Sequence, residues 1–281
     1  RRALKIFIIV HSFIKLPMKR FKILFFTPHI DDIEFGVPFT FLESLRLGNE
    51  VVEVLMTNCE FGTHRIEFKG ARLKRIRTRE LENANNVYAK YTKNHVRVLK
   101  VGYIDGYLPM NKSALNKVVD IIRTEKPDII FAPDPWYALD YHPDHINTGR
   151  LPYFALKKLT KNELTARVFY YYSFKPNFKL KCRWKDIQIV VEALSQHRSQ
   201  VTPSSAKIIG IFRKILFLRR FFSTGYFSEN FREQIFNEGY PEFPKKHNFL
   251  DNIKYLFFTR MTVPGYEKFH NVTPEELGLK T

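Results

Sequence analysis

Short apolar runs alternate with helical patterns over the first 180 residues of the chain. The predicted strands are Phe21–Thr27, Val51–Thr57, Val96–Val101, Asp128–Ala132 and Ala166–Tyr172. The predicted helices between them are Val37–Leu47, Ala71–Tyr91, Lys112–Glu125 and His145–Leu159. Continuous apolar strands that alternate with helices predict an α/β fold with a Rossmann-like, mostly parallel sheet flanked by helices on both faces.

The pattern changes after about residue 180. Trp184–Ser199 and Ala206–Phe222 have helical patterns, and Tyr255–Val263 is predicted to be a late strand. No internal repeat and no low-complexity linker interrupts the chain. We therefore expect an N-terminal extension (1–20), an α/β catalytic core (21–180) and a C-terminal α+β subdomain (181–281) that packs on the sheet and closes the active site as a lid.

Composition narrows the classes of protein. With 281 residues, 44% of them hydrophobic, the chain can bury a sizeable core. Its two cysteines, Cys59 and Cys182, cannot form a disulfide framework or a Cys-rich zinc site, so we expect a cytoplasmic protein. The apolar run Ile6–Val10 is too short to span a bilayer.

The formal charge is +18, from 46 Lys and Arg against 28 Asp and Glu. Such an excess attracts polyanions, which include nucleic acids, acidic glycans and anionic lipid headgroups. Because no nucleic-acid recognition motif accompanies the charge, nucleic-acid binding is kept only as the non-enzyme alternative. The sequence also has no Gly-x-Ser-x-Gly elbow and no phosphate-binding glycine loop, which argues against a serine hydrolase and a nucleotide-dependent enzyme.

Two clusters of His and Asp follow predicted strands. The first contains His29, Asp31, Asp32 and Glu34, and the second contains His142, Asp144 and His145. Ligands of parallel sheets bind outside the carboxyl ends of the strands, so we expect the two clusters to meet there. Two imidazoles and one carboxylate form a common catalytic zinc set, although the same set also suits Fe²⁺. A second carboxylate can then act as general base, whereas a purely structural interpretation makes the aspartates a turn or a helix N-cap.

These clusters resemble the His-Pro-Asp-Asp-x-Glu and His-Pro-Asp-His signatures of the PIG-L/LmbE deacetylases. Further segments are similar to archaeal diacetylchitobiose deacetylases, namely Tyr103–Pro109, Phe131–Trp136, His197–Gln200 and Pro264-Gly265 followed by His270. The resemblance runs from about Phe21 to Pro274 and implies an LmbE-like fold. It also implies zinc-dependent removal of the N-acetyl group of a GlcNAc-type amino sugar. Ile30 replaces the usual Pro, and Asn58 stands where many relatives have Asp.

The resemblance also implies a role for each residue of the motifs. Zinc, or Fe²⁺ or another divalent ion, would be held by His29, Asp32 and His145. Asp31 would take a proton from the attacking water, and His142, oriented by Asp144, would stabilise the oxyanion or protonate the leaving amine. Arg79, Asp105 and His270 would contact the substrate, and Glu34 would brace its loop or cap the following helix. Archaeal relatives form oligomers, so the resemblance leaves a homo-oligomer open.

The helix predicted at Ala206–Phe222 is basic and has no acidic residue. Helical spacing gathers its apolar residues on one face, namely Ile208, Ile211, Ile215, Leu218 and Phe222. One interpretation packs this face on the protein core. The other lays it on anionic lipid, which would make the enzyme peripheral at a membrane and its substrate a glycolipid such as GlcNAc-phosphatidylinositol.

Overall fold

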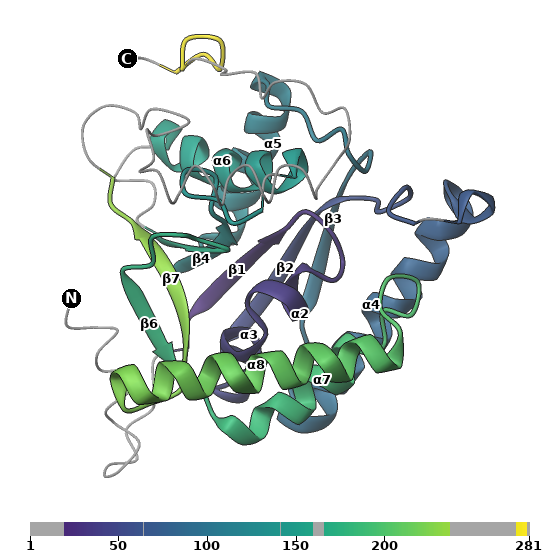
Figure 1. The fold of residues 1–281 in the computed structure, drawn as a ribbon. Coiled ribbons are helices and arrows are strands. Elements are labelled where there is room, and N and C mark those ends of the chain that lie inside the picture. The colour runs from purple at the N-terminus through teal and green to yellow at the C-terminus, as the bar shows by residue number, and fades with distance from the viewer. Residues whose placement is uncertain (1–19, 64, 141, 160–165, 237–273, 280–281) are drawn as a thin grey trace, which may run out of the picture.

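The computed structural model describes residues 20–63, 65–140, 142–159, 166–236 and 274–279. At its centre lies a seven-stranded sheet in the order β3-β2-β1-β4-β5-β7-β6 (Figure 1). The strands are β1 (Lys22–Thr27), β2 (Glu50–Thr57), β3 (Arg97–Tyr103), β4 (Ile129–Pro133), β5 (Arg167–Tyr171), β6 (Phe178–Lys181) and β7 (Ser228–Gln234). Strands β1 to β5 pair in parallel, and β7 runs antiparallel to β5 and β6. The predicted Rossmann-like, mostly parallel sheet is therefore confirmed.

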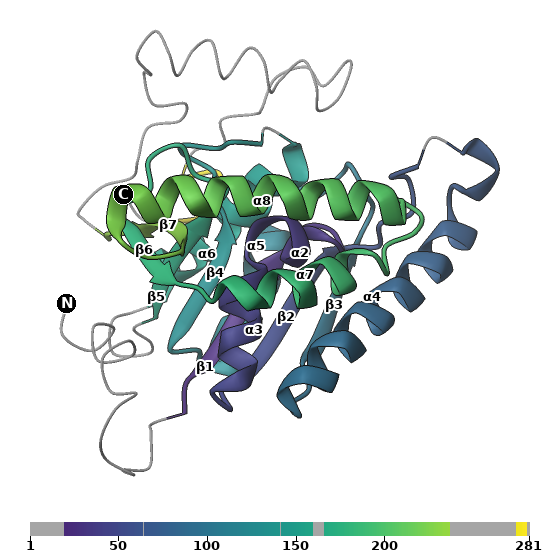
Figure 2. The same cartoon turned by 60° about the horizontal axis from the view of Figure 1, so that its bottom comes forward.

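Helices cover both faces of the sheet (Figures 1 and 2). One face packs on α5 (Lys112–Glu125) and α6 (Pro143–Lys158), which bury an apolar cluster with β1, β2, β4 and β5. The other face packs on α2 (Asp32–Gly36), α3 (Pro38–Arg46), α4 (Ala71–Thr92) and α7 (Ile187–Leu194). The central strands β1, β4 and β5 are apolar on both sides because each face of the sheet is covered.

The sheet order reverses direction between β1 and β4, and this point fixes where a binding site can form. β1 lies between β2 and β4, so the chain passes from β1 to one half of the sheet and from β4 to the other. At such a switch point the loops after the two strands separate and leave a crevice at their carboxyl ends. The His29 and His142 clusters lie at the ends of these two loops and in the helices α2 and α6 that follow them.

The region after residue 180 differs in part from the prediction. Within Trp184–Ser199 the structure has a 3-10 turn, η2 (Trp184–Asp186), then α7, which ends at Leu194 and gives way to a loop. Strands β6 and β7 were not predicted, because β6 has only four residues and β7 is mostly polar. They form because β7 pairs with both β5 and β6. The expected boundary between residues 180 and 181 crosses β6. The predicted strand Tyr255–Val263 lies outside the described residues, and the lid role stays a prediction.

Helix α8 (Pro203–Thr224) packs on α7 with its apolar face turned outward. Ile208, Ile211 and Ile215 are exposed, whereas Arg213 lies half-buried on the inner side and Phe217 is buried there. The interpretation that packs the Ile208 face on the core is therefore wrong for the part of the chain that the structure describes. The inner face suffices to hold α8, because the small residues Ala206 and Gly210 allow close approach.

Candidate active site

The loop after β1 turns directly into α2 and separates two adjacent carboxylates. Asp32 Oδ2 accepts a hydrogen bond from the His29 main-chain N–H at 2.8 Å, which folds the loop back on itself. Asp31 occupies the N-cap position of α2, but its side chain makes no capping hydrogen bond. Its Oδ1 instead lies 3.1 Å from Nη2 of Arg77 on α4. The structural interpretation of Asp31 as a helix cap therefore fails, and the two aspartates face different partners.

The loop after β4 leads into α6, which carries the second cluster at its start. His142 is the N-cap residue, and its Nδ1 accepts the main-chain N–H of Asp144 at 3.2 Å. An imidazole that accepts at Nδ1 holds its proton at Nε2, so His142 presents an N–H donor on its other edge. Gly149 lets α6 approach the end of β4, since a Cβ there would meet the Pro133 carbonyl oxygen at 2.2 Å. This close approach sets the depth of His145 in the site.

The two clusters meet as expected. One ligand atom from each of His29, Asp32 and His145 lies within 4.8 Å of the others, a grouping that can hold a metal ion. Asp32 joins the two loops, because its oxygens lie 3.4 Å from His29 Nδ1 and 3.4 Å from His145 Nε2. His29, His142 and Asp144 form a second such grouping that shares His29.

The charges in this site favour a cation. Burial lowers the pKa of His29, but the carboxylates of Asp105, Asp144 and Asp32 outweigh burial and raise this pKa well above its ordinary value. Burial raises the pKa of Asp32, and the nearby His145 and His29 outweigh it and lower this pKa to about 2. Several carboxylates thus converge on one imidazole in a buried place. Such a donor set, with two imidazoles and a carboxylate at its centre, fits a divalent metal ion.

Two carboxylates tie the loop after β3 to the site: Asp105 lies in that loop, and Asp144 reaches it from the first turn of α6. Asp105 Oδ2 accepts the main-chain N–H groups of Phe61 and Gly62, both at 2.9 Å, and its Oδ1 lies 3.1 Å from His29 Nε2. The Asp144 carboxylate accepts the N–H groups of Gly106 and Leu108 at 2.6 and 2.9 Å. The main-chain amide of Asp144 therefore contacts His142. The Asp144 carboxylate instead holds the loop after β3, a contact that was not predicted from the sequence.

Arg77 is a site residue that sequence reasoning missed. It is 3% exposed and lines the pocket, whereas Arg79, the arginine expected to contact the substrate, is exposed and does not line it. The reason is helical phase: Leu73, Arg77 and Leu81 share the buried face of α4, and Arg79 lies two residues out of phase. The signal that could have identified Arg77 is a charged residue in helical phase with the buried apolar residues Leu73 and Leu81.

A buried pair behind α2 anchors the loop that follows α7. His197 Nε2 lies 3.0 Å from Glu34 Oε2, and both side chains are almost completely buried. Glu80 on α4 accepts hydrogen bonds from the Ser199 N–H and hydroxyl at 2.7 and 2.6 Å. Together these contacts bring Gln200 to the pocket wall. Of the two roles expected for Glu34, bracing the loop or capping the following helix, the contact with His197 fits the first.

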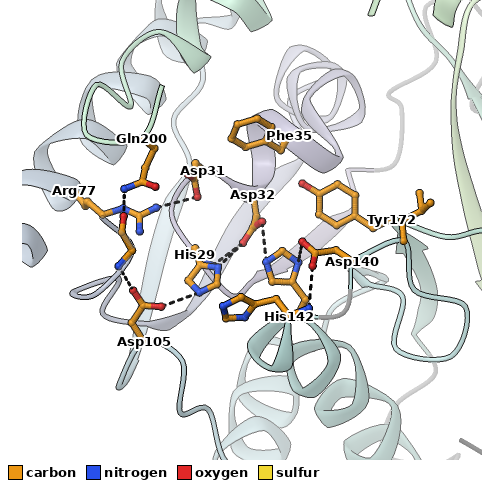
Figure 3. Close-up of a pocket in the computed structure, with 13 residues that line it drawn as sticks. His29, Asp31, Asp32, Phe35, Arg77, Asp105, Asp140, His142, Tyr172 and Gln200 are labelled. Atoms are coloured by element: carbon orange, nitrogen blue, oxygen red, sulfur yellow. Dashed lines mark hydrogen bonds and ion pairs between the residues drawn. The ribbon is translucent and has the colours of Figure 1, made fainter. Parts of the chain in front are cut away.

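The pocket above these residues has a volume of about 600 Å³ (Figure 3). Its wall includes Phe35, Leu139, Asp140, Tyr172 and Gln200, none of which was predicted as a site residue. Tyr172 has φ 54° and its ring stacks on His145 with centroids 5.8 Å apart. Left-handed backbone is unfavourable for a tyrosine, and such strain gathers at functional sites. His270 lies outside the described residues.

Two further cavities adjoin the pocket. One, of about 270 Å³, shares Phe35, Leu139 and Tyr172 with it and is lined on its far side by α8. The other, of about 540 Å³, shares Gly62 and Gln200 and includes Phe68 and Arg198. The site therefore has room for a ligand longer than one sugar unit.

Comparison with known proteins agrees with this geometry. The family model "PIG-L: GlcNAc-PI de-N-acetylase" matches residues 24–156. The diacetylchitobiose deacetylase of Thermococcus kodakarensis is 30% identical over 196 residues, which cover 64% of this chain and 70% of that protein. The chain therefore belongs to the PIG-L family, and the resemblance seen in its motifs is confirmed.

Solved structures show the same fold. The N,N′-diacetylchitobiose deacetylase of Pyrococcus horikoshii, in complex with an inhibitor, is 26% identical with a TM-score of 0.64, covering 76% of this chain and 83% of that one. The 4-carboxy-2-hydroxymuconate hydratase of Pseudomonas putida KT2440 also has a TM-score of 0.64 at 14% identity, covering 80% of this chain and 100% of that one. Because the second similarity concerns the fold alone, the reaction has to be argued from the site.

Proposed function

We propose that this protein is a zinc-dependent hydrolase that removes the N-acetyl group from a GlcNAc-type amino sugar. The observation that carries the proposal is that the adjacent carboxylates of Asp31 and Asp32 have different neighbours. Asp32 faces His29 and His145 inside the metal-binding group, whereas Asp31 faces the pocket beside Arg77. In a metal-dependent amide hydrolysis of this type, one carboxylate binds the metal ion and another moves a proton, and adjacent residues here can supply both.

The ion would be held by His29, Asp32 and His145. A divalent metal bound there supplies Lewis-acid chemistry, which activates water and polarises the amide carbonyl. Asp31 accepts the proton of the attacking water, and the ion pair with Arg77 orients its carboxylate. The Nε2–H of His142 then donates to the oxygen on which negative charge develops, because its Nδ1 is occupied by the Asp144 amide. As the C–N bond breaks, the proton held by Asp31 passes to the departing amine nitrogen.

The names of the relatives support the substrate class. The archaeal proteins are diacetylchitobiose deacetylases, and the family description names a GlcNAc-linked substrate. The adjoining cavities favour a saccharide of more than one unit over free GlcNAc. We therefore expect N,N′-diacetylchitobiose to be a better substrate than GlcNAc.

The test is acetate release from N,N′-diacetylchitobiose and GlcNAc by metal-depleted protein, with and without restored zinc, beside Asp31→Ala. Zinc-dependent release that collapses in the variant supports the proposal. Release that is unaffected by metal removal would overturn the metal-dependent reaction. Equal release by Asp31→Ala and the wild type would overturn the role of Asp31. Restoration by Fe²⁺ but not by zinc would change the metal and keep the chemistry.

A second candidate is the same reaction on an amino sugar carried by a membrane lipid. The observation that favours it is the outward apolar face of α8, which also borders the cavity beside the pocket. Within the described residues, no helix is both long and apolar enough to cross a bilayer. Acetate release from a lipid-linked GlcNAc substrate in vesicles, compared with soluble chitobiose, separates the two candidates.

Nucleic-acid binding stays the non-enzyme alternative, and the oligomeric state stays open. A DNA mobility shift that weakens with salt would support the first, because counterion release makes such binding salt-dependent. Sedimentation velocity measures the second.

A further inference from the structure

The outer face of α8 carries a continuous stripe of large apolar side chains. The exposed fractions are 65% for Ile208, 57% for Ile211, 59% for Phe212, 57% for Ile215, 42% for Leu218 and 83% for Phe222. At 22 residues the helix is about 33 Å long, so the stripe extends along much of the molecule. Soluble monomers rarely expose apolar patches of this kind unless something binds them.

The inner face of α8 fixes this orientation. Gly210 packs so closely on α7 that an added Cβ would meet Val191 Cγ2 at 2.6 Å. Arg213 Nη2 donates to the main-chain oxygens of Glu34 and Phe35, and Phe217 is buried against Phe39. Rotating the helix to bury its apolar stripe would break all of these contacts. The outward stripe is therefore a fixed property of the fold.

Basic side chains accompany the stripe. Lys207 and Lys214 lie along one edge, Arg219 lies within the stripe, and all three are exposed. The helix contains no acidic residue, and the whole chain carries a net charge of +18. A helix with one apolar stripe, basic flanks and no acidic residue matches the chemistry of an anionic lipid interface.

We propose that the outer face of α8 binds the surface of an anionic membrane, with the helix lying in the plane of the interface. The apolar side chains enter the boundary between headgroups and acyl chains, and Lys207, Lys214 and Arg219 contact lipid phosphates. A second copy of this chain fits the face less well, because a symmetric contact would bring the same cations together. The proposal concerns binding alone and does not rest on the deacetylase reaction.

This surface lies beside the active site. The cavity lined by Arg213, Phe217 and Arg220 shares its opposite wall, which includes Phe35 and Tyr172, with the active-site pocket. A membrane bound to the outer face of α8 would therefore lie one helix diameter from this wall, about 10 Å.

Co-sedimentation with phosphatidylcholine vesicles, with and without phosphatidylglycerol, tests the proposal. We expect the wild type to bind only the vesicles that contain phosphatidylglycerol. Ile211→Glu/Ile215→Glu should weaken that binding at least about a hundredfold, because it places charges in the apolar stripe. Lys207→Gln/Lys214→Gln/Arg219→Gln should weaken it about a hundredfold through lost lipid contacts. Ile66→Glu is the matched control, since Ile66 is 80% exposed on a different element, and it should bind like the wild type.

Each variant is also assayed for thermal unfolding, for acetate release from soluble chitobiose and for mass by sedimentation velocity. Unchanged unfolding and activity with lost vesicle binding support a surface role for α8. Binding that survives both α8 variants overturns the proposal. A third outcome is a wild type that is a dimer and does not bind vesicles, and that Ile211→Glu/Ile215→Glu converts to a monomer. This result would assign the outer face of α8 to a contact with a second copy of the chain. A monomeric wild type that does not bind anionic vesicles also overturns the proposal.

Discussion

Nη2 of Arg77 lies 3.1 Å from Oδ1 of Asp31, and both residues line the pocket that contains the metal-binding group. Burial lowers the pKa of the Arg77 guanidinium, but the carboxylate of Asp31 and the other nearby anions outweigh it and raise this pKa. Arg77 is therefore a buried, permanent cation whose main partner is the proposed general base. Its role is to hold the Asp31 carboxylate in one orientation.

The first prediction separates Arg77 from Arg79. Arg77→Met should lower kcat for chitobiose about a hundredfold, because a misplaced base loses its alignment with the attacking water. Arg79→Met is the matched control on the same helix and should keep wild-type kcat, since Arg79 is exposed away from the pocket. Steady-state acetate release measures both. Equal losses in the two variants would contradict the assignment of Arg77.

The second prediction separates the adjacent aspartates. Asp32→Asn should lose bound metal, because Asp32 is the carboxylate of the metal-binding group. Asp31→Asn should keep one metal ion per chain and lower kcat by about a hundredfold or more, which is the usual contribution of a general base. Elemental analysis after dialysis and acetate release measure the two effects. Stoichiometric metal in Asp32→Asn would show that the metal is held elsewhere.

The third prediction concerns the Glu34–His197 pair. His197→Ala leaves the Glu34 carboxylate buried without its partner, so the free energy of unfolding should fall by about 3–5 kcal/mol. Urea unfolding measures the change, and the exposed His95→Ala is the control, expected within about 0.5 kcal/mol of the wild type. Glu34→Gln/His197→Ala should recover part of the loss, since it removes the unpaired charge. No recovery would assign the loss to packing.

The fourth prediction is a pH dependence of stability from Glu53. This side chain is fully buried in β2, and burial, reinforced by the charges of Glu34 and Asp32, raises its pKa to about 8 despite a hydrogen bond from Thr27 and the nearby His197. The folded protein thus holds a proton that the unfolded chain releases near pH 4.5. Stability from this group is complete below about pH 4.5 and falls as the pH rises towards 8.

Glu53→Gln removes this titration. The free energy of unfolding is measured by urea denaturation at about pH 5 and about pH 9. Between these two pH values it should decrease by a few kcal/mol less in Glu53→Gln than in the wild type. Glu50→Gln, on the same strand with its side chain 52% exposed, should keep the wild-type pH dependence. Parallel pH profiles for the wild type and Glu53→Gln would contradict a raised pKa at Glu53.

Much of the site was predictable because its signals are local. His29, Asp31 and Asp32 directly follow a continuous apolar strand, and His142 and His145 follow another. Their place at the carboxyl ends of strands in a parallel sheet indicated that the loops would meet. Arg77 could also have been predicted, because its position on the buried face of α4 follows from the helical period. Tyr172 directly follows β5, a position that the same argument covers, although it was not predicted. Gln200 was not predictable, since its loop is held at the pocket by contacts with the distant residues Glu34 and Glu80.

The sequence by itself determined the fold class, the two clusters of His and Asp at the carboxyl ends of strands and the amphipathic character of α8. These properties depend on periodicity and on residue types at short spacing, which are local. Only the tertiary structure decided which partner each aspartate faces, that the Asp144 carboxylate holds the loop after β3, and that the apolar stripe of α8 points outward. Periodicity divides a helix into two faces, but packing against α7 selects which face is buried. Here the small residues Ala206 and Gly210 allow the closer contact, so that face turns inward and the larger apolar side chains remain exposed.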